Sequence, residues 1–254
     1  FRNKISIKEN LSFDKKKDFV ILPEIFAHLA SDLLIKNKIK YAIFVQNGYS
    51  INFTNNLKKL ELAYSKAEFI LSYSSDISEC IKLNFPKLKT EIIKIKYSIA
   101  SNSIKKKVRK KNLITYMSRK LPVHSNHVVL LLKKYLPKNW NIKDLNNIDE
   151  KLVYRNLQES KVFLAFSNLE GLPLPPVEAA LAGNYVVGYT GEGGKDYWKK
   201  PIFTEIYSGD IRNFVQKTLE KVNKYNSKNK MLKLQYNKLA KEFSKQNEII
   251  HIKK

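Results

Sequence analysis

Two glutamates in the second half of the chain are candidates for hydrogen bonding to a ligand. Glu170 lies in a loop, and Glu178 lies eight positions later, within a helix that Pro175 and Pro176 open. Proline fits the first turn of a helix, where the backbone N–H groups have no partner inside the helix. Because an ionised carboxylate accepts several hydrogen bonds, each glutamate is suited to accept from a pair of neighbouring hydroxyl groups.

A basic pair, Arg119-Lys120, supplies the opposite charge at the end of the strand predicted over 112–117. The carboxyl ends of parallel strands meet at one edge of a sheet, which is where open α/β sheets bind ligands. Negative charge on a phosphate group is stabilised by cations and N–H donors, and a helix N-terminus provides such donors. We therefore expect the basic pair and the start of the helix near Pro175 to border one phosphate site.

The elements that must position these residues are a strand, a loop, a helix and a second strand. The apolar run 162–166 predicts the strand that leads into the loop, and Gly183 predicts the end of the helix, since glycine is common just past a helix C-terminus. The run 185–188 predicts the next strand. The glycine-rich residues 189–195 that follow fit either a cradle for phosphate or sugar or a plain flexible turn.

Alternation of apolar strands with helical stretches along the chain predicts an α/β protein with parallel sheets. Further strands are expected at 18–22, 41–45, 68–72, 91–95, 140–144 and 203–207. Further helices are expected at 23–37, 56–65, 74–84, after Pro122, at 149–160, and as a pair between 210 and 243. The lysine-rich segment 98–111 has no sustained apolar pattern, so we expect a solvated linker between two domains, residues 1–104 and residues 105–254.

The formal charge of +24 is the most extreme property of the composition. Five of the 47 basic residues are arginine, whereas recognition of phosphates and bases favours the planar fork of arginine. The lysine excess therefore fits compositional drift with solvated faces, with attraction to an anionic membrane surface or another polyanion as the alternative. No nucleic-acid-binding motif with interleaved aromatic residues is present, so nucleic acid is not an expected partner.

Cysteine use and motif content limit the setting and the chemistry. The single cysteine, Cys80, excludes an internal disulfide and a cysteine-based metal cluster, which favours a reducing, cytoplasmic location. No apolar run approaches the roughly 20 residues of a membrane-spanning helix. No Asp-x-Asp motif occurs, and His124 and His127 on one predicted helix have no evident carboxylate or cysteine partner, so no metal site is expected.

Residues 167–183 resemble the Glu-x7-Glu signature of GT-B glycosyltransferases of the retaining family 4 type. The matching positions are Ser167, Glu170, Gly171, Leu174, Glu178, Ala179, Ala182 and Gly183. A weaker similarity covers the rest of the second half, including the strand that ends in a basic pair. The first half, with Pro23-Glu24 and Gln46-Asn47-Gly48-Tyr49, looks like the acceptor-side domain of such enzymes.

The resemblance implies two Rossmann-like domains that face one another across a cleft. It implies transfer of a hexose from a nucleotide-sugar to a glycan or lipid-linked acceptor, with retention at the anomeric carbon, no essential metal and no cofactor besides the donor substrate. Residues 1–104 would present the acceptor, and residues 105–254 would bind the donor. Such an enzyme would work in the cytoplasm, and its basic surface would give it peripheral contact with the anionic inner face of the membrane.

The resemblance also implies a role for each matching residue. Glu170, Arg119 and Lys120 would be catalytic, with the glutamate at hydroxyls of the donor sugar and the basic pair at the diphosphate. Glu178 would bind the ribose of the nucleotide. The remaining donor-binding residues would be Ser167, Gly171, Leu172 and Leu174.

The sequence departs from this family at three places. Pro173 replaces a glycine and, with the two prolines that open the helix, leaves fewer backbone N–H groups for phosphate. Lys120 follows Arg119 directly, without the family's spacing. The glycine-rich first loop of the amino-terminal domain is absent and the chain begins at Phe1, so we expect an amino-terminally truncated chain. The alternatives are a catalytically degenerate glycosyltransferase and a basic protein that binds polyanions or nucleic acid.

Overall fold

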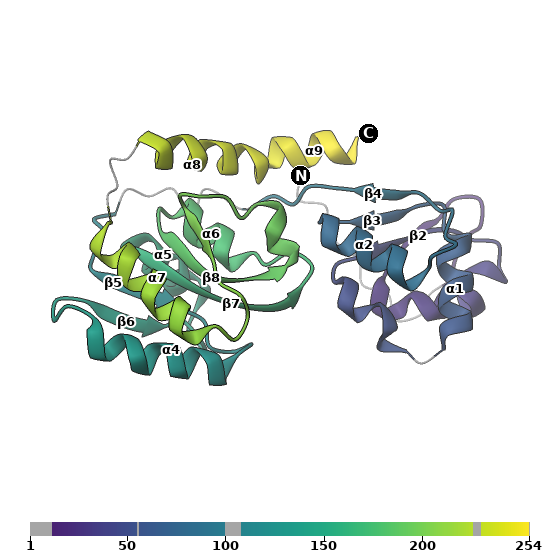
Figure 1. Ribbon diagram of the computed structural model, residues 1–254. Helices are drawn as coiled ribbons and strands as arrows, with labels where there is room; N and C mark the ends of the chain where they lie inside the picture. Colours follow the sequence, from purple (N-terminus) through teal and green to yellow (C-terminus); the bar gives the residue numbers. More distant parts are fainter. Residues whose placement is uncertain (1–11, 55, 100–107, 226–229, 254) are drawn as a thin grey trace.

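The computed structural model describes residues 12–54, 56–99, 108–225 and 230–253, which form two α/β domains that lie side by side (Figure 1). One sheet has four strands in the order β1-β2-β3-β4, and the other has five in the order β6-β5-β7-β8-β9. Every strand pair is parallel. The predicted α/β class with parallel sheets is therefore confirmed. The predicted boundary between residues 104 and 105 lies outside the described residues.

The first domain contains β1 (Phe19–Pro23), β2 (Lys40–Val45), β3 (Ile70–Ser72) and β4 (Ile92–Lys94). Its helical segments are η1 (Glu24–Leu29), η2 (Ser31–Ile35), η3 (Gly48–Phe53), α1 (Leu57–Lys66) and α2 (Ser75–Asn84). Ser74 begins α2 because its side chain accepts a hydrogen bond from the N–H of Ile77, a cap worth about 1 kcal/mol. A single apolar core joins these helical segments to the sheet.

The second domain contains β5 (Leu113–Tyr116), β6 (Asn141–Asp144), β7 (Val162–Glu170), β8 (Tyr185–Glu192) and β9 (Phe203–Glu205). Helices α4 (Pro122–Tyr135) and α7 (Ile211–Asn223) cover one face of its sheet. Helices α5 (Glu150–Glu159), α6 (Pro175–Leu181) and α8 (Lys230–Glu242) cover the other. Because side chains alternate between the faces of a strand, β7 contributes apolar residues to both cores.

The C-terminal helices α8 and α9 (Lys245–Ile252) run along the top of the molecule in Figure 1, from the second domain toward the first. Both are anchored to the segment that follows β4. Glu242 forms an ion pair with Lys96 at 2.7 Å, and Glu248 accepts a hydrogen bond from the Ser98 hydroxyl at 2.7 Å. The sequence predicted two helices after residue 210, so α9 is an additional helix. Ser244 begins it by accepting from the N–H of Asn247.

Two predicted elements differ from the structure. The helix expected over 23–37 is a 3-10 segment followed by a π-helical turn. Its start is fixed by a tertiary contact, because the buried carboxylate of Glu24 accepts from the N–H groups of Gln46 and Asn47, and such contacts override helix propensity. The glycine-rich segment 189–195, expected as a cradle or as a flexible turn, is largely β8 and the 3-10 helix η4 (Gly193–Asp196), whose two glycines are buried, since β8 continues to pair with β7.

The lysine-rich linker was predicted to be solvated, which is wrong for Lys110, although its neighbours Arg109 and Lys111 are exposed. The Lys110 ammonium donates to the carbonyls of Leu157 at 3.3 Å, Ser160 at 2.7 Å and Ala182 at 2.6 Å. Residues 100–107 of that segment lie outside the described residues. Within the described ranges, no helix combines the length and the hydrophobicity that a membrane crossing requires.

Candidate functional site

A cavity of about 250 Å³ lies at the carboxyl ends of β5 and β7. Its wall combines the turn after β5, most of β7 and the loop that leads into α6. The sequence-predicted residues that line it are Arg119, Lys120, Ser167, Glu170, Leu172 and Leu174. Residues from three separate elements therefore meet at the sheet edge where a parallel α/β sheet binds ligands.

Glu170 and Lys120 form an ion pair across this cavity. The Lys120 ammonium lies 2.7 Å from Oε2 of Glu170, and the side chains are 41% and 16% exposed. Glu170 is the last residue of β7, whereas Lys120 lies in the turn between β5 and α4. The two strands are paired neighbours in the sheet, which brings their ends together. The carboxylate and the ammonium are thus placed to meet hydroxyl and phosphate groups of one ligand.

Arg119 is exposed at the cavity and has no hydrogen bond or ion pair with the residues that the structure describes. The turn that carries it is held from the neighbouring strand, because the N–H of Ser118 donates to the Asp144 carboxylate at the end of β6, at 3.3 Å. A guanidinium without a protein partner keeps all five N–H donors for a ligand. A phosphate group can therefore bind Arg119 without displacing a carboxylate of the described residues.

Glu178 lies one turn into α6 and is not among the residues that line the cavity. Its carboxylate points toward α5, where the hydroxyl of Tyr154 lies 3.4 Å from Oε1. Burial raises the pKa of Glu178 above its usual range, although the Tyr154 hydrogen bond opposes this shift. The structure thus separates the two glutamates: Glu170 faces Lys120 in the cavity, and Glu178 lies between α5 and α6.

Gly171 lies where three backbone segments pass close together. A Cβ atom on Gly171 would overlap the carbonyl oxygen of Gln46 in the first domain and the side chain of Ile77. A Cβ atom on Gly193 would in turn overlap the carbonyl oxygen of Gly171. Both positions therefore require glycine for close approach, not for an unusual φ angle. Gly171, a donor-binding residue in the sequence-based prediction, lies at the contact between the domains.

The residue before Glu170 is also held from the first domain. Leu169 has φ of +47°, a left-handed conformation that costs a residue with a Cβ atom about 1 kcal/mol. Its carbonyl oxygen accepts a hydrogen bond from the side-chain amide of Asn47 at 3.0 Å. Such conformations persist where the surroundings determine them and are frequent at functional sites. The turn after β2 therefore helps to fix the loop that carries Glu170.

Positive charge at the site comes mainly from side chains. Pro175 and Pro176 have no N–H group, and the N–H of Glu178 donates to the Leu174 carbonyl within the helix at 3.0 Å. The start of α6 thus offers fewer donors than the general expectation for a helix N-terminus. The reduction in backbone donors predicted from the prolines agrees with this geometry, and Arg119 and Lys120 supply the cationic groups.

Several residues of the site were not singled out in the sequence. Tyr154 follows no recognisable motif, and its role as partner of Glu178 depends on how α5 packs against α6. Tyr197 is buried, and its hydroxyl donates to the Pro173 carbonyl at 2.6 Å. His124, by contrast, was considered in the sequence as a metal ligand, and its ring nitrogen lies 3.2 Å from the Tyr189 hydroxyl. In the part of the chain that the structure describes, no three His, Cys, Asp or Glu residues are grouped so that they could hold a metal ion.

Comparison with known proteins identifies the fold. The sequence matches no protein-family model and no curated protein. The structure is similar to a TarM variant from S. aureus in complex with fondaparinux, alpha-GlcNAc-glycerol and UDP. That match has a TM-score of 0.65 and 14% identity, and covers 84% of this chain and 50% of TarM. The pneumococcal O-GlcNAc transferase GtfA, in complex with UDP and GlcNAc, matches with a TM-score of 0.62 and 16% identity over 94% of this chain and 56% of GtfA. The chain has the GT-B fold.

A third solved structure is also similar to this chain. A UDP-forming alpha,alpha-trehalose-phosphate synthase from Burkholderia xenovorans matches with a TM-score of 0.64 and 10% identity, over 93% of this chain and 72% of that one. The chain spans about half the length of TarM and of GtfA. Two Rossmann-like domains, as the sequence predicted, are therefore established, and the cavity beside Glu170 lies in the second of them.

Proposed function

We propose that this protein is a glycosyltransferase whose donor substrate is a nucleotide-sugar. The observation that carries the proposal is the convergence of Arg119, Lys120 and Glu170 on one cavity at the strand ends of a GT-B domain. The TarM and GtfA structures to which the chain is similar contain UDP, which favours a nucleoside diphosphate as the ligand. Anionic oxygens of the diphosphate would bind Arg119 and Lys120, and hydroxyls of the sugar would bind Glu170.

The proposed reaction is transfer of a hexose with retention of configuration and without an essential metal. An acceptor hydroxyl oxygen forms a bond to the anomeric carbon on the face from which the bond to the diphosphate oxygen breaks. The hydroxyl proton passes to the departing phosphate, and the nucleoside diphosphate leaves. Arg119 and Lys120 stabilise the negative charge that grows on the leaving group, the kind of electrostatic stabilisation that usually contributes most to catalysis. No side chain of the protein forms a covalent intermediate in this scheme.

The first domain presents the acceptor in this proposal, and the acceptor is a glycan or a lipid-linked glycan. The basic composition, with its net charge of +24, favours peripheral contact with an anionic membrane surface at the cytoplasmic face. Glu178 would bind the ribose of the nucleotide, in a position between α5 and α6 where Tyr154 is its neighbour. Ser167, Leu172 and Leu174 would line the donor pocket beside them.

Nucleotide binding tests this proposal most directly. Thermal stability is measured with UDP, GDP, dTDP and ADP, for the natural sequence and for Arg119→Gln. A nucleotide at about 100 times its dissociation constant adds about 2.7 kcal/mol to the free energy of unfolding. Arg119→Gln should reduce that gain without changing the stability of the free protein, because Arg119 has no partner among the described residues.

Arg212→Gln is the matched control, since Arg212 is an exposed arginine at the start of α7. It should leave the gain from nucleotide unchanged. If none of the four nucleotides stabilises the natural sequence, the donor-site proposal fails. If a nucleotide stabilises the natural sequence and Arg119→Gln equally, the site exists but the role proposed for Arg119 is wrong.

A further inference from the structure

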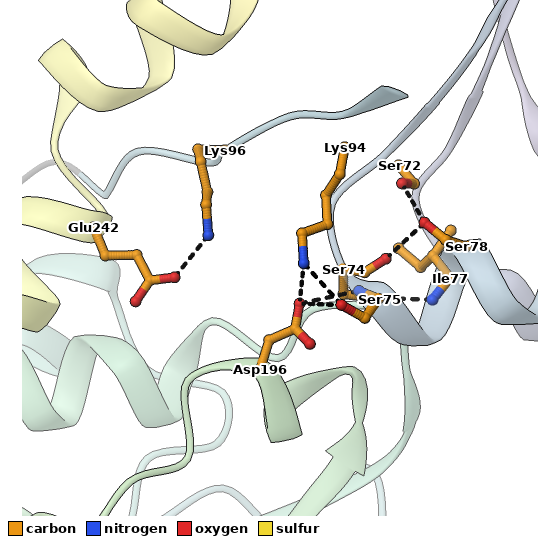
Figure 2. A network of polar contacts seen from close by, with 9 residues as sticks. All are labelled: Ser72, Ser74, Ser75, Ile77, Ser78, Lys94, Lys96, Asp196 and Glu242. Atoms are coloured by element: carbon orange, nitrogen blue, oxygen red, sulfur yellow. Dashed lines mark hydrogen bonds and ion pairs between the residues drawn. The ribbon is translucent and has the colours of Figure 1, made fainter. Parts of the chain in front are cut away.

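Among the residues that the structure describes, the carboxylate of Asp196 in the second domain has donors in the first domain (Figure 2). Asp196, the last residue of η4, accepts through Oδ2 from the backbone N–H of Ser75 at 3.0 Å and from the Lys94 ammonium at 2.9 Å. The Ser75 hydroxyl lies 3.3 Å from the same oxygen and also accepts from Lys94 at 2.8 Å. Ser75 begins α2 and Lys94 ends β4, so the contact joins η4 to two elements of the other domain.

The environment keeps Asp196 ionised at neutral pH. Burial alone would raise its pKa, but the hydrogen bonds from Lys94 and Ser75 outweigh burial and hold the pKa of the carboxyl below its usual range. The N-terminal end of α2 also favours a negative charge. The side chains of Asp196 and Lys94 are 24% and 36% exposed, so solvent screens this pair less than a fully exposed one. Hydrogen bonds of this charged kind are stronger than those between neutral groups.

Helix η4 also touches the loop that follows Glu170. The Gly193 backbone packs directly against the Gly171 carbonyl, with no room for a Cβ atom between them. Tyr197, the residue after η4, donates its hydroxyl to the Pro173 carbonyl at 2.6 Å. Asp196 lies between these two contacts in the sequence. A short helix anchored to the first domain thus supports both ends of the segment from Gly171 to Pro173.

We infer that Asp196 is an interdomain latch, which holds the two domains in contact and, through η4, fixes the end of β7 and the loop that follows it (168–174) at the cavity. Without the latch, η4 loses its anchor on α2 and β4, and the loop loses the support of a fixed η4. Asp196 acts through the backbone around it, so it is a positioning residue. The inference concerns the arrangement of the chain itself and does not depend on which ligand the cavity binds.

The test compares three variants by small-angle X-ray scattering and by hydrogen exchange of peptides that cover 168–174. Asp196→Ala removes every latch contact, and Asp196→Asn keeps an acceptor for the Ser75 N–H but loses the charge. Glu192→Gln is the matched control, because Glu192 is a carboxylate beside η4 that pairs at 2.6 Å with Lys195 within the second domain. All three are first checked by thermal unfolding, and Asp196→Asn remains informative if the alanine variant does not fold.

If Asp196 is a latch, the three substitutions should change the radius of gyration and the amide exchange to different extents. Asp196→Ala should have a larger radius of gyration than the natural sequence and should exchange the 168–174 amides about tenfold faster, as loss of charge-assisted hydrogen bonds allows. Asp196→Asn should lie between these two proteins, and Glu192→Gln should match the natural sequence. An unchanged radius of gyration in folded Asp196→Ala overturns the latch. A larger radius with unchanged exchange at 168–174 overturns its control of the loop.

Discussion

The Lys120 ammonium lies 2.7 Å from a carboxylate oxygen of Glu170, inside the cavity at the carboxyl ends of β5 and β7. Each residue is therefore the other's partner when no ligand is present. A phosphate that binds Lys120 competes with Glu170 for the same ammonium. Glu170 can accept a hydrogen bond from a sugar hydroxyl and still pair with Lys120, since a carboxylate has about four lone-pair positions. The pair thus opposes phosphate binding and tolerates sugar binding.

Because of this competition, substitutions of Glu170 and of Lys120 should change the affinity for UDP in opposite directions. Glu170→Gln removes the charge that competes for Lys120, so the dissociation constant for UDP should fall by about two- to fivefold, the scale of a partly exposed ion pair. Lys120→Met removes a cation, so that constant should rise by a similar or larger factor. Transfer from a nucleotide-sugar should decrease in both variants, because each loses a group that the proposed reaction uses. Isothermal titration calorimetry and a transfer assay measure the two effects.

Lys134→Met provides the control for loss of one positive charge, since Lys134 is exposed in the last turn of α4. It should leave UDP affinity within experimental error of the natural sequence at moderate ionic strength. Equal weakening by Lys134→Met and Lys120→Met would mean that only net charge matters. Weaker UDP binding by Glu170→Gln would contradict the competition between Glu170 and phosphate.

Glu178 should show opposite effects on stability and on ligand binding. Because burial raises its pKa, the folded state favours the neutral acid. Its stabilising contribution is fully present below the ordinary pKa of 4.5 and is lost as the pH rises through the folded-state pKa. Glutamine stays neutral, so Glu178→Gln should melt at a higher temperature than the natural sequence at pH 7 and at nearly the same temperature near pH 4.

If Glu178 binds the ribose, the same substitution should raise the dissociation constant for UDP about tenfold, through loss of charged hydrogen bonds. Melting curves from pH 4 to pH 8, with and without UDP, give both quantities. The exposed Glu61 on α1 provides the control, since Glu61→Gln should change neither. Higher stability together with unchanged UDP affinity would leave Glu178 as a buried carboxylate outside the donor site.

Much of the fold follows from local patterns in the sequence. Alternating strands and helices predict the parallel α/β class, and caps such as Ser74 mark where helices start. The end of β7 was predicted too early, at 166, because the pairing of Ser167 with Thr190 and of Glu170 with Glu192 depends on β8. The first helix was predicted as regular because the anchor of Glu24 on Gln46 and Asn47 joins residues far apart in the chain.

Part of the candidate site could also be predicted from local patterns in the sequence. Arg119, Lys120 and Glu170 follow parallel strands, and strand ends in one sheet meet at one edge, so their convergence was expected. Contacts between the domains join residues that are far apart in the sequence, so no local pattern predicts them. Nothing in the sequence around Asp196 shows that its carboxylate faces Ser75 across the interface. The lysine run around Lys110 resembles a solvated linker, and only packing shows which lysine is enclosed.

Gly171 should not tolerate a larger residue. In Gly171→Ala the new methyl group overlaps the Gln46 carbonyl oxygen, a backbone atom that cannot rotate away. The first domain must then move, at a cost of about 1–3 kcal/mol in the free energy of unfolding, and the radius of gyration should increase. Gly209→Ala is the contrast, because its φ of +90° makes alanine unfavourable although no atom lies within 4 Å of the added Cβ. It should destabilise the protein without changing the scattering. Similar scattering curves for both variants would contradict the close approach inferred at Gly171.

Two neighbouring lysines should differ strongly in their contribution to stability. The Lys110 ammonium donates to the carbonyls of Leu157, Ser160 and Ala182, and burial lowers the pKa of Lys110 to about 7. Lys110→Met leaves those carbonyls without their donor, so it should reduce the free energy of unfolding by about 2–4 kcal/mol. Lys111 is 62% exposed and pairs with Glu159, so Lys111→Met should cost less than about 1 kcal/mol. Urea unfolding at pH 7 measures both, and equal costs would show that Lys110 does not hold the ends of α5 and α6 together.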